Sequence, residues 1–239
     1  MSALLFALIA ALGNIAGGYA VVRHERRSLA VIEQFVAFGA GFMLAVALLE
    51  VAPEAIARRS DAAIYILLGY LAVHLAQHVF VPHFHFGEET HRVSARQGVS
   101  ALLGLLLHTF FDGVAIASGF LVSNHLGLLL FLAVFFHKLP EGLAMSSVML
   151  AGGQSRMRAL GASGLLGIAT ILGVILTEVS APLAAHGLAI SAGVTLYVAA
   201  SNLVPEFQAR RGWRLPTSFF GGAAMFFVTR LLVEAVGLR

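Results

Sequence analysis

The sequence predicts an all-α polytopic membrane protein with eight transmembrane helices, in which helices 1–3 and 6–8 form an inverted repeat around helices 4 and 5. Of its 239 residues, 59% are apolar and 11% charged, with a mean hydropathy of +0.90. A soluble domain is closer to half apolar and a quarter charged. Eight apolar segments have the length of about 20 residues that a bilayer core requires. Two of these segments share a sequence pattern, which predicts the repeat.

The eight segments follow one another without a linker of biased composition, so we expect a single domain, residues 1–239. The first segment resembles a signal peptide, but it lacks a basic start and an obvious cleavage site and runs directly into Arg23. We therefore expect it to be retained as a helix. The expected spans are residues 2–22, 32–52, 62–81, 98–122, 126–150, 159–183, 186–205 and 216–236.

The arginines orient the predicted helices. Cytoplasmic loops carry an excess of Lys and Arg, and the first, third, fifth and seventh loops hold ten arginines, whereas the even loops hold only Arg58 and Arg59. This predicts that both termini lie outside the cytoplasm, in a multi-pass protein of the cell (inner or plasma) membrane. Because the arginines cluster between apolar segments rather than along one polar face, the pI of about 9.8 indicates topology and not a nucleic-acid partner.

The second and seventh spans share Ala-Gly near the start and Pro-Glu at the end, at the same spacing. In the second span these are Gly41 and Pro53, and in the seventh they are Gly193 and Pro205. The predicted topology runs the second span outward and the seventh inward. Similar segments of opposite orientation are typical of an inverted repeat. The small residues also favour close helix packing.

Two runs in the fourth and fifth spans carry the most informative side chains. Each has a histidine and a carboxylate four residues apart: His108 with Asp112, and His137 with Glu141. Residues at this spacing share one face of a helix, and ionisable groups inside a membrane usually mark a site or pathway. Imidazole and carboxylate suit zinc, iron, manganese, cobalt or cadmium. With no cysteine in the chain, we expect these four residues to bind metal near the bilayer midplane, where transporters place substrates.

Two neighbours modify this predicted site. Pro140 cannot donate to the carbonyl of Phe136, which frees a backbone oxygen and bends the helix. Lys138 lies in mid-span, where we expect an ion pair with Asp112 or Glu141 rather than a side chain that extends to the membrane surface.

Other polar groups leave alternatives open. Met43 is either a thioether ligand or core filling, and Glu178 either joins an ion pathway or pairs near the surface. Glu50, Glu54 and Glu206, at span ends, are solvated edges or an ion-attracting mouth. The cytoplasmic loop 82–97 either binds metal or is simply solvated, and its histidines are His83, His85 and His91.

At the two His-carboxylate runs, the chain resembles the ZIP (Zrt/Irt-like) family of divalent metal transporters, in its bacterial type. Members carry His-x-x-x-(Asp/Glu)-Gly on the fourth helix, here His108 to Gly113, and a His- or Gln-led run that ends in Glu on the fifth, here His137 to Glu141. The resemblance covers essentially the whole chain. It implies uptake of divalent metal into the cytoplasm, Zn²⁺ foremost, with Cd²⁺, Fe²⁺ and Mn²⁺ also open, and it implies no other cofactor.

Family members often hold two metals. The resemblance places His108, Asp112, His137 and Glu141 at the primary site, with Met43 a weaker match. The secondary site uses an Asn, an acidic residue and a Glu before a Pro on the sixth helix. These positions are Thr109, Lys138 and Ala181 here, so all three ligands are lost. We therefore expect a mononuclear site in which the Lys138 ammonium stands in for the second metal.

Two alternative functions use the same residues. An intramembrane metal-dependent hydrolase needs an open metal position for water and a carboxylate base, but the sequence contains no His-Glu-x-x-His motif. A metal-sensing membrane protein would depend on the histidines of loop 82–97. For the transporter, the expected partners are the metal ion and the lipid bilayer, and the sequence leaves a homodimer open.

Overall fold

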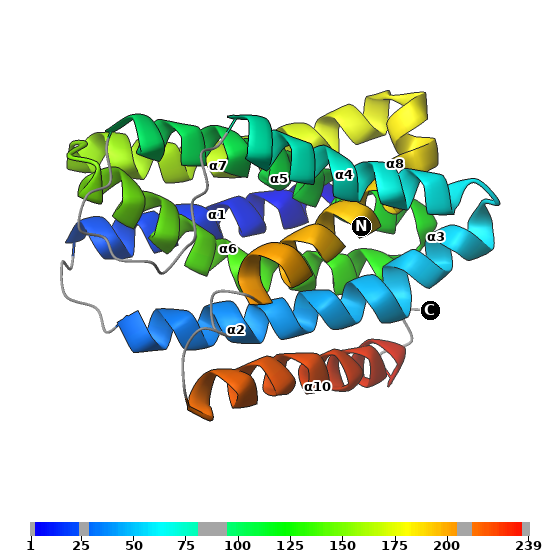
Figure 1. The fold of residues 1–239 in the computed structure, drawn as a ribbon. Helices are drawn as coiled ribbons and strands as arrows, with labels where there is room; N and C mark the ends of the chain where they lie inside the picture. Colours follow the sequence, from blue (N-terminus) through cyan, green and yellow to red (C-terminus); the bar gives the residue numbers. More distant parts are fainter. Residues whose placement is uncertain (1–2, 24–28, 81–94, 205–211, 236–239) are drawn as a thin grey trace.

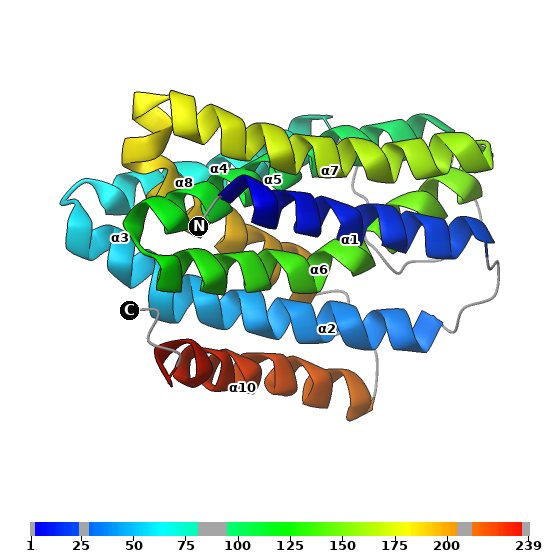
Figure 2. The same cartoon turned by 180° about the vertical axis from the view of Figure 1, so that it is seen from behind.

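The computed structural model describes residues 3–23, 29–80, 95–204 and 212–235, which form a bundle of long helices lying side by side (Figures 1 and 2). The elements are α1 (Ala3–Arg23), α2 (Leu29–Val46), the π-helix η1 (Ala47–Val51), α3 (Ala52–Arg58), α4 (Ala62–Phe80), α5 (Ala95–Val122), α6 (Asn124–Ala151), α7 (Arg156–Val179), α8 (Ala181–Tyr197), the π-helix η3 (Val198–Leu203) and α10 (Arg214–Ala235).

Apart from Ser180, helical structure covers the described part of each predicted span. Among the described residues, seven helices are long and apolar enough to cross a membrane, and Ala62–Ala76 is a shorter apolar helix. The all-α polytopic membrane fold is therefore confirmed. The boundary between the sixth and seventh spans lies earlier than expected: the sixth was expected to reach residue 183, whereas α7 ends at Val179 and α8 begins at Ala181. Pro182 lies in the first turn of α8, where its missing N–H leaves no helical bond unmade.

The turn between α5 and α6 sets the depth of the predicted site. Ser123 is extended, and its side chain accepts a hydrogen bond from the backbone N–H of Leu126 at 3.1 Å, which caps α6. His108 lies 15 residues before this turn and His137 lies 14 residues after it. Since each helical residue rises about 1.5 Å, the two histidines come to the same level on neighbouring helices.

Both halves of the predicted repeat contain a π-helix at the same place. Ala52, which precedes Pro53, donates its N–H to the carbonyl of Ala47, and Val204, which precedes Pro205, donates to Ala199. Each bond spans five residues instead of four. Proline has no N–H and therefore removes one hydrogen bond of a regular α-helix. Both segments contain a π-helical turn just before the proline, and such turns are frequent at functional positions.

Reciprocal glycine contacts hold four pairs of helices together. In each pair, a glycine of either helix lies against a backbone carbonyl oxygen of the other, so closely that a Cβ atom has no room. The glycine and carbonyl partners are Gly17 with Leu139 and Gly142 with Asn14 (α1 and α6), Gly173 with Phe110 and Gly113 with Thr170 (α7 and α5), Gly41 with Phe219 and Gly222 with Phe38 (α2 and α10), and Gly193 with Ile66 and Gly69 with Ile190 (α8 and α4).

These contacts recur at equivalent positions of the two halves. Asn14 and Gly17 on α1 are spaced as Thr170 and Gly173 are on α7. The α1–α6 contact therefore corresponds to the α7–α5 contact, and the α2–α10 contact corresponds to the α8–α4 contact. This packing agrees with the inverted repeat that the sequence predicts.

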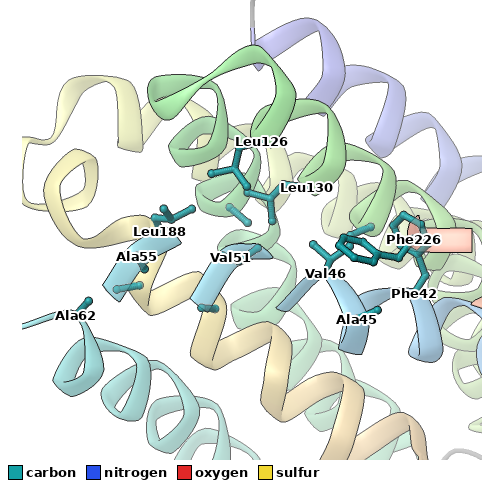
Figure 3. Close-up of a cluster of buried hydrophobic side chains, with 14 residues drawn as sticks. Phe42, Ala45, Val46, Val51, Ala55, Ala62, Leu126, Leu130, Leu188 and Phe226 are labelled. Atoms are coloured by element: carbon teal, nitrogen blue, oxygen red, sulfur yellow. The ribbon is translucent and has the colours of Figure 1, made fainter. Parts of the chain in front are cut away.

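An apolar cluster anchors α6 to α2 and η1 (Figure 3). Phe42 and Val46 of α2 and Val51 of η1 are almost completely buried, and they lie in one cluster with Leu126 and Leu130 of α6. The Phe42 ring also meets the Phe136 ring in a T-shaped arrangement, with 5.0 Å between ring centroids. These side-chain contacts pack α6, which carries part of the predicted site, against α2 and η1 of the second span.

Candidate metal centre

Five ionisable side chains from α5 and α6 meet inside the bundle, and all are buried. Asp112 lies at the centre: its Oδ2 atom is 3.4 Å from His108 Nε2 and 3.2 Å from His137 Nε2. Lys138 Nζ donates to the same Asp112 oxygen at 2.6 Å and to Glu141 Oε2 at 2.6 Å. The structure thus brings together the four residues predicted as ligands, with the lysine among them.

Three of these side chains have the geometry of a metal site. One ligand atom each of His108, Asp112 and His137 lies within 4.8 Å of the others. His137 Nδ1 faces the carbonyl oxygen of Ala133 at 2.8 Å. Since a carbonyl only accepts, Nδ1 carries a proton, and Nε2, which faces Asp112, is the ring nitrogen directed into the site, an arrangement common for metal-binding histidines. Two imidazoles and one carboxylate form a ligand set that zinc accepts.

The second carboxylate is held by protein donors. Glu141 Oε1 accepts a hydrogen bond from Thr109 Oγ1 at 2.6 Å, and Oε2 accepts from Lys138. Thr109 and Lys138, the residues at two of the predicted secondary-site positions, therefore both contact Glu141. Ala181, the third, is exposed as the first residue of α8 and is not part of this cluster.

The Lys138 ammonium neutralises part of the buried negative charge by direct contact. Lys138 is completely buried, a position that is tolerated only with close partners of opposite charge. Its ammonium faces two carboxylates. With neutral imidazoles, the cluster therefore keeps one net negative charge, which favours the entry of a cation.

Sequence reasoning missed two buried polar residues beside this cluster. Asn14 of α1 is completely buried, and its amide nitrogen, in the orientation that satisfies its neighbours, donates to Glu141 Oε2 at 3.3 Å and to the carbonyl oxygen of Lys138. Thr170 of α7 is also completely buried, with its backbone against Gly113. The signal for Asn14 was present, because a lone amide in an Ala- and Gly-rich span needs a hydrogen-bond partner.

The remaining predicted candidates have surroundings of different kinds. Met43 is buried in an apolar group with Val73 and Tyr197, and Phe111 packs against this group. Glu178 is exposed in the last turn of α7. Residues 83, 85 and 91, the loop histidines, lie outside the described part of the chain, as does residue 206.

A cavity of about 320 Å³ lies near the α5–α6 turn and is lined in part by Glu50, Glu54 and His125. Both glutamates are paired with arginines: Glu54 with Arg58 at 2.6 Å, and Glu50 with Arg230 at 3.5 Å. These span-end acids thus face a cavity, but their charges are already balanced.

Comparison with known proteins gives a consistent set of relatives. The model of the ZIP zinc transporter family matches residues 82–229. The zinc transporter YKE4 of Saccharomyces cerevisiae is 24% identical over 224 residues, which cover 77% of this chain and 63% of YKE4. Zinc transporter ZIP9-B of Xenopus laevis is 30% identical over 155 residues (59% of this chain, 51% of the relative), and human zinc transporter ZIP4 is 37% identical over 119 residues (47% and 18%).

This chain spans less than two thirds of the length of each of these three relatives. They come from yeast, frog and human, so the bacterial type stays a prediction. The family model, however, matches more than half of the chain and includes both His-carboxylate runs. The chain therefore belongs to the ZIP zinc transporter family.

Proposed function

We propose that this protein transports divalent transition-metal ions, with zinc as the principal substrate, through the buried site on α5 and α6. The observation that carries the proposal is the group formed by His108, Asp112 and His137, whose ligand atoms lie within 4.8 Å of one another inside membrane-spanning helices. Members of this family are transporters and not enzymes, so we do not retain the hydrolase alternative. The sensor alternative depends on residues 83–91, which lie outside the described part of the chain.

We further propose uptake into the cytoplasm across the cell membrane, with both termini outside. The direction is what the resemblance to the family implies, and the orientation follows from the arginines of the odd-numbered loops. Access alternates between the two sides as one set of helices moves relative to the other, the usual behaviour of transporters built on inverted repeats.

Lys138 gives this site its particular chemistry. Its ammonium binds Asp112 and Glu141 at 2.6 Å each, so an ion that binds Asp112 shares this carboxylate with a fixed positive charge. Repulsion between the two cations lowers the affinity of the site, and transport needs binding that is weak enough for release. We propose one metal per site, with Lys138 in place of a second.

The experiment that tests transport measures uptake into proteoliposomes loaded with a fluorescent chelator, for Zn²⁺, Cd²⁺, Mn²⁺ and Fe²⁺. We expect saturable uptake by the unaltered protein, fastest for Zn²⁺, and background rates for His108→Ala/His137→Ala. The double variant His125→Ala/His186→Ala carries the same chemical change outside the cluster and should retain uptake. Metal that binds to the unaltered protein but never crosses the membrane would contradict transport.

A separate prediction concerns Lys138→Met, which keeps most of the side-chain volume and removes the charge. Without the ammonium, Asp112 and Glu141 face each other unbalanced, so we expect metal affinity to rise about tenfold or more and a second ion to bind. Metal per protein is measured by equilibrium dialysis and elemental analysis. Added Zn²⁺ should also raise the melting temperature of the variant more than that of the unaltered protein. If metal stoichiometry and transport are unchanged in this variant, Lys138 does not take the place of a second metal ion.

A further inference from the structure

We infer that Asn14 is a positioning residue of the metal site: its amide holds the Glu141 carboxylate against Lys138, which leaves His108, Asp112 and His137 as the metal ligands. The inference rests on the proposed function, since it assigns roles within that site. Asn14 is on α1, outside both sequence motifs, and neither the motifs nor the family resemblance draws attention to it.

The burial of Asn14 requires a hydrogen-bond partner. The other buried residues of α1 are alanines, glycines and Phe6, and Asn14 is the polar residue among them, with no exposed surface. Burying an amide without hydrogen-bond partners in such a place is strongly unfavourable. Its nitrogen meets this need by donating to Glu141 Oε2 at 3.3 Å and to the Lys138 carbonyl oxygen.

Asn14 completes a set of donors around Glu141. Oε1 accepts from Thr109 of α5, while Oε2 accepts from Lys138 of α6 and from Asn14 of α1. Both oxygens of this carboxylate are therefore held by donors from three helices. Hydrogen bonds to a charged group are stronger than those between neutral groups, and drawing Glu141 onto a metal means breaking at least one of them.

The helix packing gives the Asn14 side chain its direction. The backbone oxygen of Asn14 lies against Gly142, the residue that follows Glu141, and Gly17 lies against Leu139 one turn away. These contacts fix α1 on α6 at the level of the carboxylate. A side chain at position 14 is thereby directed to Glu141 and not to the lipid.

The equivalent position in the other half supports a specific role. Thr170 on α7 lies against Gly113, the residue that follows Asp112. Its hydroxyl bonds within its own helix, to the carbonyl oxygen of Leu166 at 3.4 Å. Of the two equivalent side chains, Asn14 reaches a carboxylate and Thr170 bonds to its own helix. This difference agrees with separate roles for the two carboxylates, in which Glu141 is held by protein donors and Asp112 binds the metal.

A double-mutant cycle tests this role in the purified full chain in detergent, with Cd²⁺ binding measured by calorimetry. Asn14→Leu keeps the branched shape of the side chain and removes the donor, and we expect about tenfold weaker binding, the scale seen when hydrogen-bonding residues that surround a metal site are replaced. The background Lys138→Met/Glu141→Gln removes the pair that Asn14 positions. In this background Cd²⁺ still binds to the three ligands, and Asn14→Leu should change the affinity less than about twofold.

Two controls separate positioning from general packing. Phe6→Leu loosens a buried contact of the same helix away from the cluster and should leave the Cd²⁺ affinity unchanged. Asn14→Ser retains a donor and should restore part of the affinity lost in Asn14→Leu; it also serves if the leucine variant does not fold. Equal effects of the Asn14 substitution in both backgrounds would overturn the positioning role while leaving the metal site intact. Failure of the unaltered protein to bind Cd²⁺ or Zn²⁺ would overturn the proposed function as well.

Discussion

The rate of metal uptake by the variant Asp112→Asn should fall at least about a hundredfold, which is the largest loss of activity that we expect from one isosteric substitution. Asp112 Oδ2 is the meeting point of both histidines and Lys138. An amide there leaves the lysine with only one counter-charge and gives the cluster no net negative charge to attract a cation. Removing one partner of a buried ion pair typically costs about 3–5 kcal/mol, so the melting temperature is measured beside the uptake rate.

The matched control is Asp61→Asn. Asp61 is half-exposed between α3 and α4, and a hydrogen bond from the Arg59 guanidinium lowers its pKa. Exposed ion pairs contribute little to stability, so uptake and melting temperature should stay close to those of the unaltered protein. Undiminished zinc uptake by Asp112→Asn would rule out the proposed ligand set.

The variant Gly142→Ala should lose the most stability. A Cβ atom at this position would overlap the backbone of Asn14, and neither helix can yield without breaking the other contacts between α1 and α6. Overpacking usually costs about 1–3 kcal/mol, and we expect the upper end or more, because the opposing atoms are backbone. For a chain of this size, about 3 kcal/mol lowers the melting temperature by about 6–12 °C.

Gly161→Ala on α7 provides the comparison. A Cβ atom on Gly161 would meet no neighbouring atom within 4 Å, and alanine is the better helix former by about 1 kcal/mol. The melting temperature of this variant should therefore be unchanged or slightly higher. If Gly142→Ala were as stable as Gly161→Ala, the close approach of α1 and α6 would not be a feature of the native fold.

The sequence was sufficient for the parts of the fold that depend on composition and period. Hydropathy alone locates the spans, and a spacing of four residues puts His108 and Asp112 on one helical face. It also predicts that Lys138 needs an acidic partner, and the structure shows two. The level at which α5 and α6 meet follows from Ser123, whose distance to each histidine can be counted along the chain.

Features of the site that depend on contacts between distant segments could not be predicted from the sequence. Asn14 reaches Glu141 only because two glycines bring α1 against α6, and nothing in the first span indicates its neighbour. Ala181 was assigned to the sixth span because hydropathy runs through Ser180 without a break, whereas the helix itself ends at Val179. Whether Glu141 contacts a metal or a lysine is likewise a matter of side-chain placement.

The reciprocal glycine contacts also limit how this bundle can slip. Helices whose backbones are in reciprocal glycine contact resist sliding past each other. Such contacts join α1 to α6 and α5 to α7, and the buried cluster joins α5 to α6. These four helices therefore form one block. The contact of α6 with α2 is of another kind. A Cβ atom on Gly39 would lie 3.6 Å from His137 Cβ, an ordinary distance, and the rings of Phe38, Phe42 and Phe136 fill the space between the helices.

Aromatic side chains can rotate and form contacts with new neighbours when two helices move. A backbone carbonyl oxygen packed against a glycine cannot do so without separating the helices. For the proposed transport cycle, we therefore expect helices to slide at the α6–α2 contact and not within the block that carries the buried cluster. In such a motion the five side chains of the cluster would keep their mutual contacts, because all of them belong to α5 and α6.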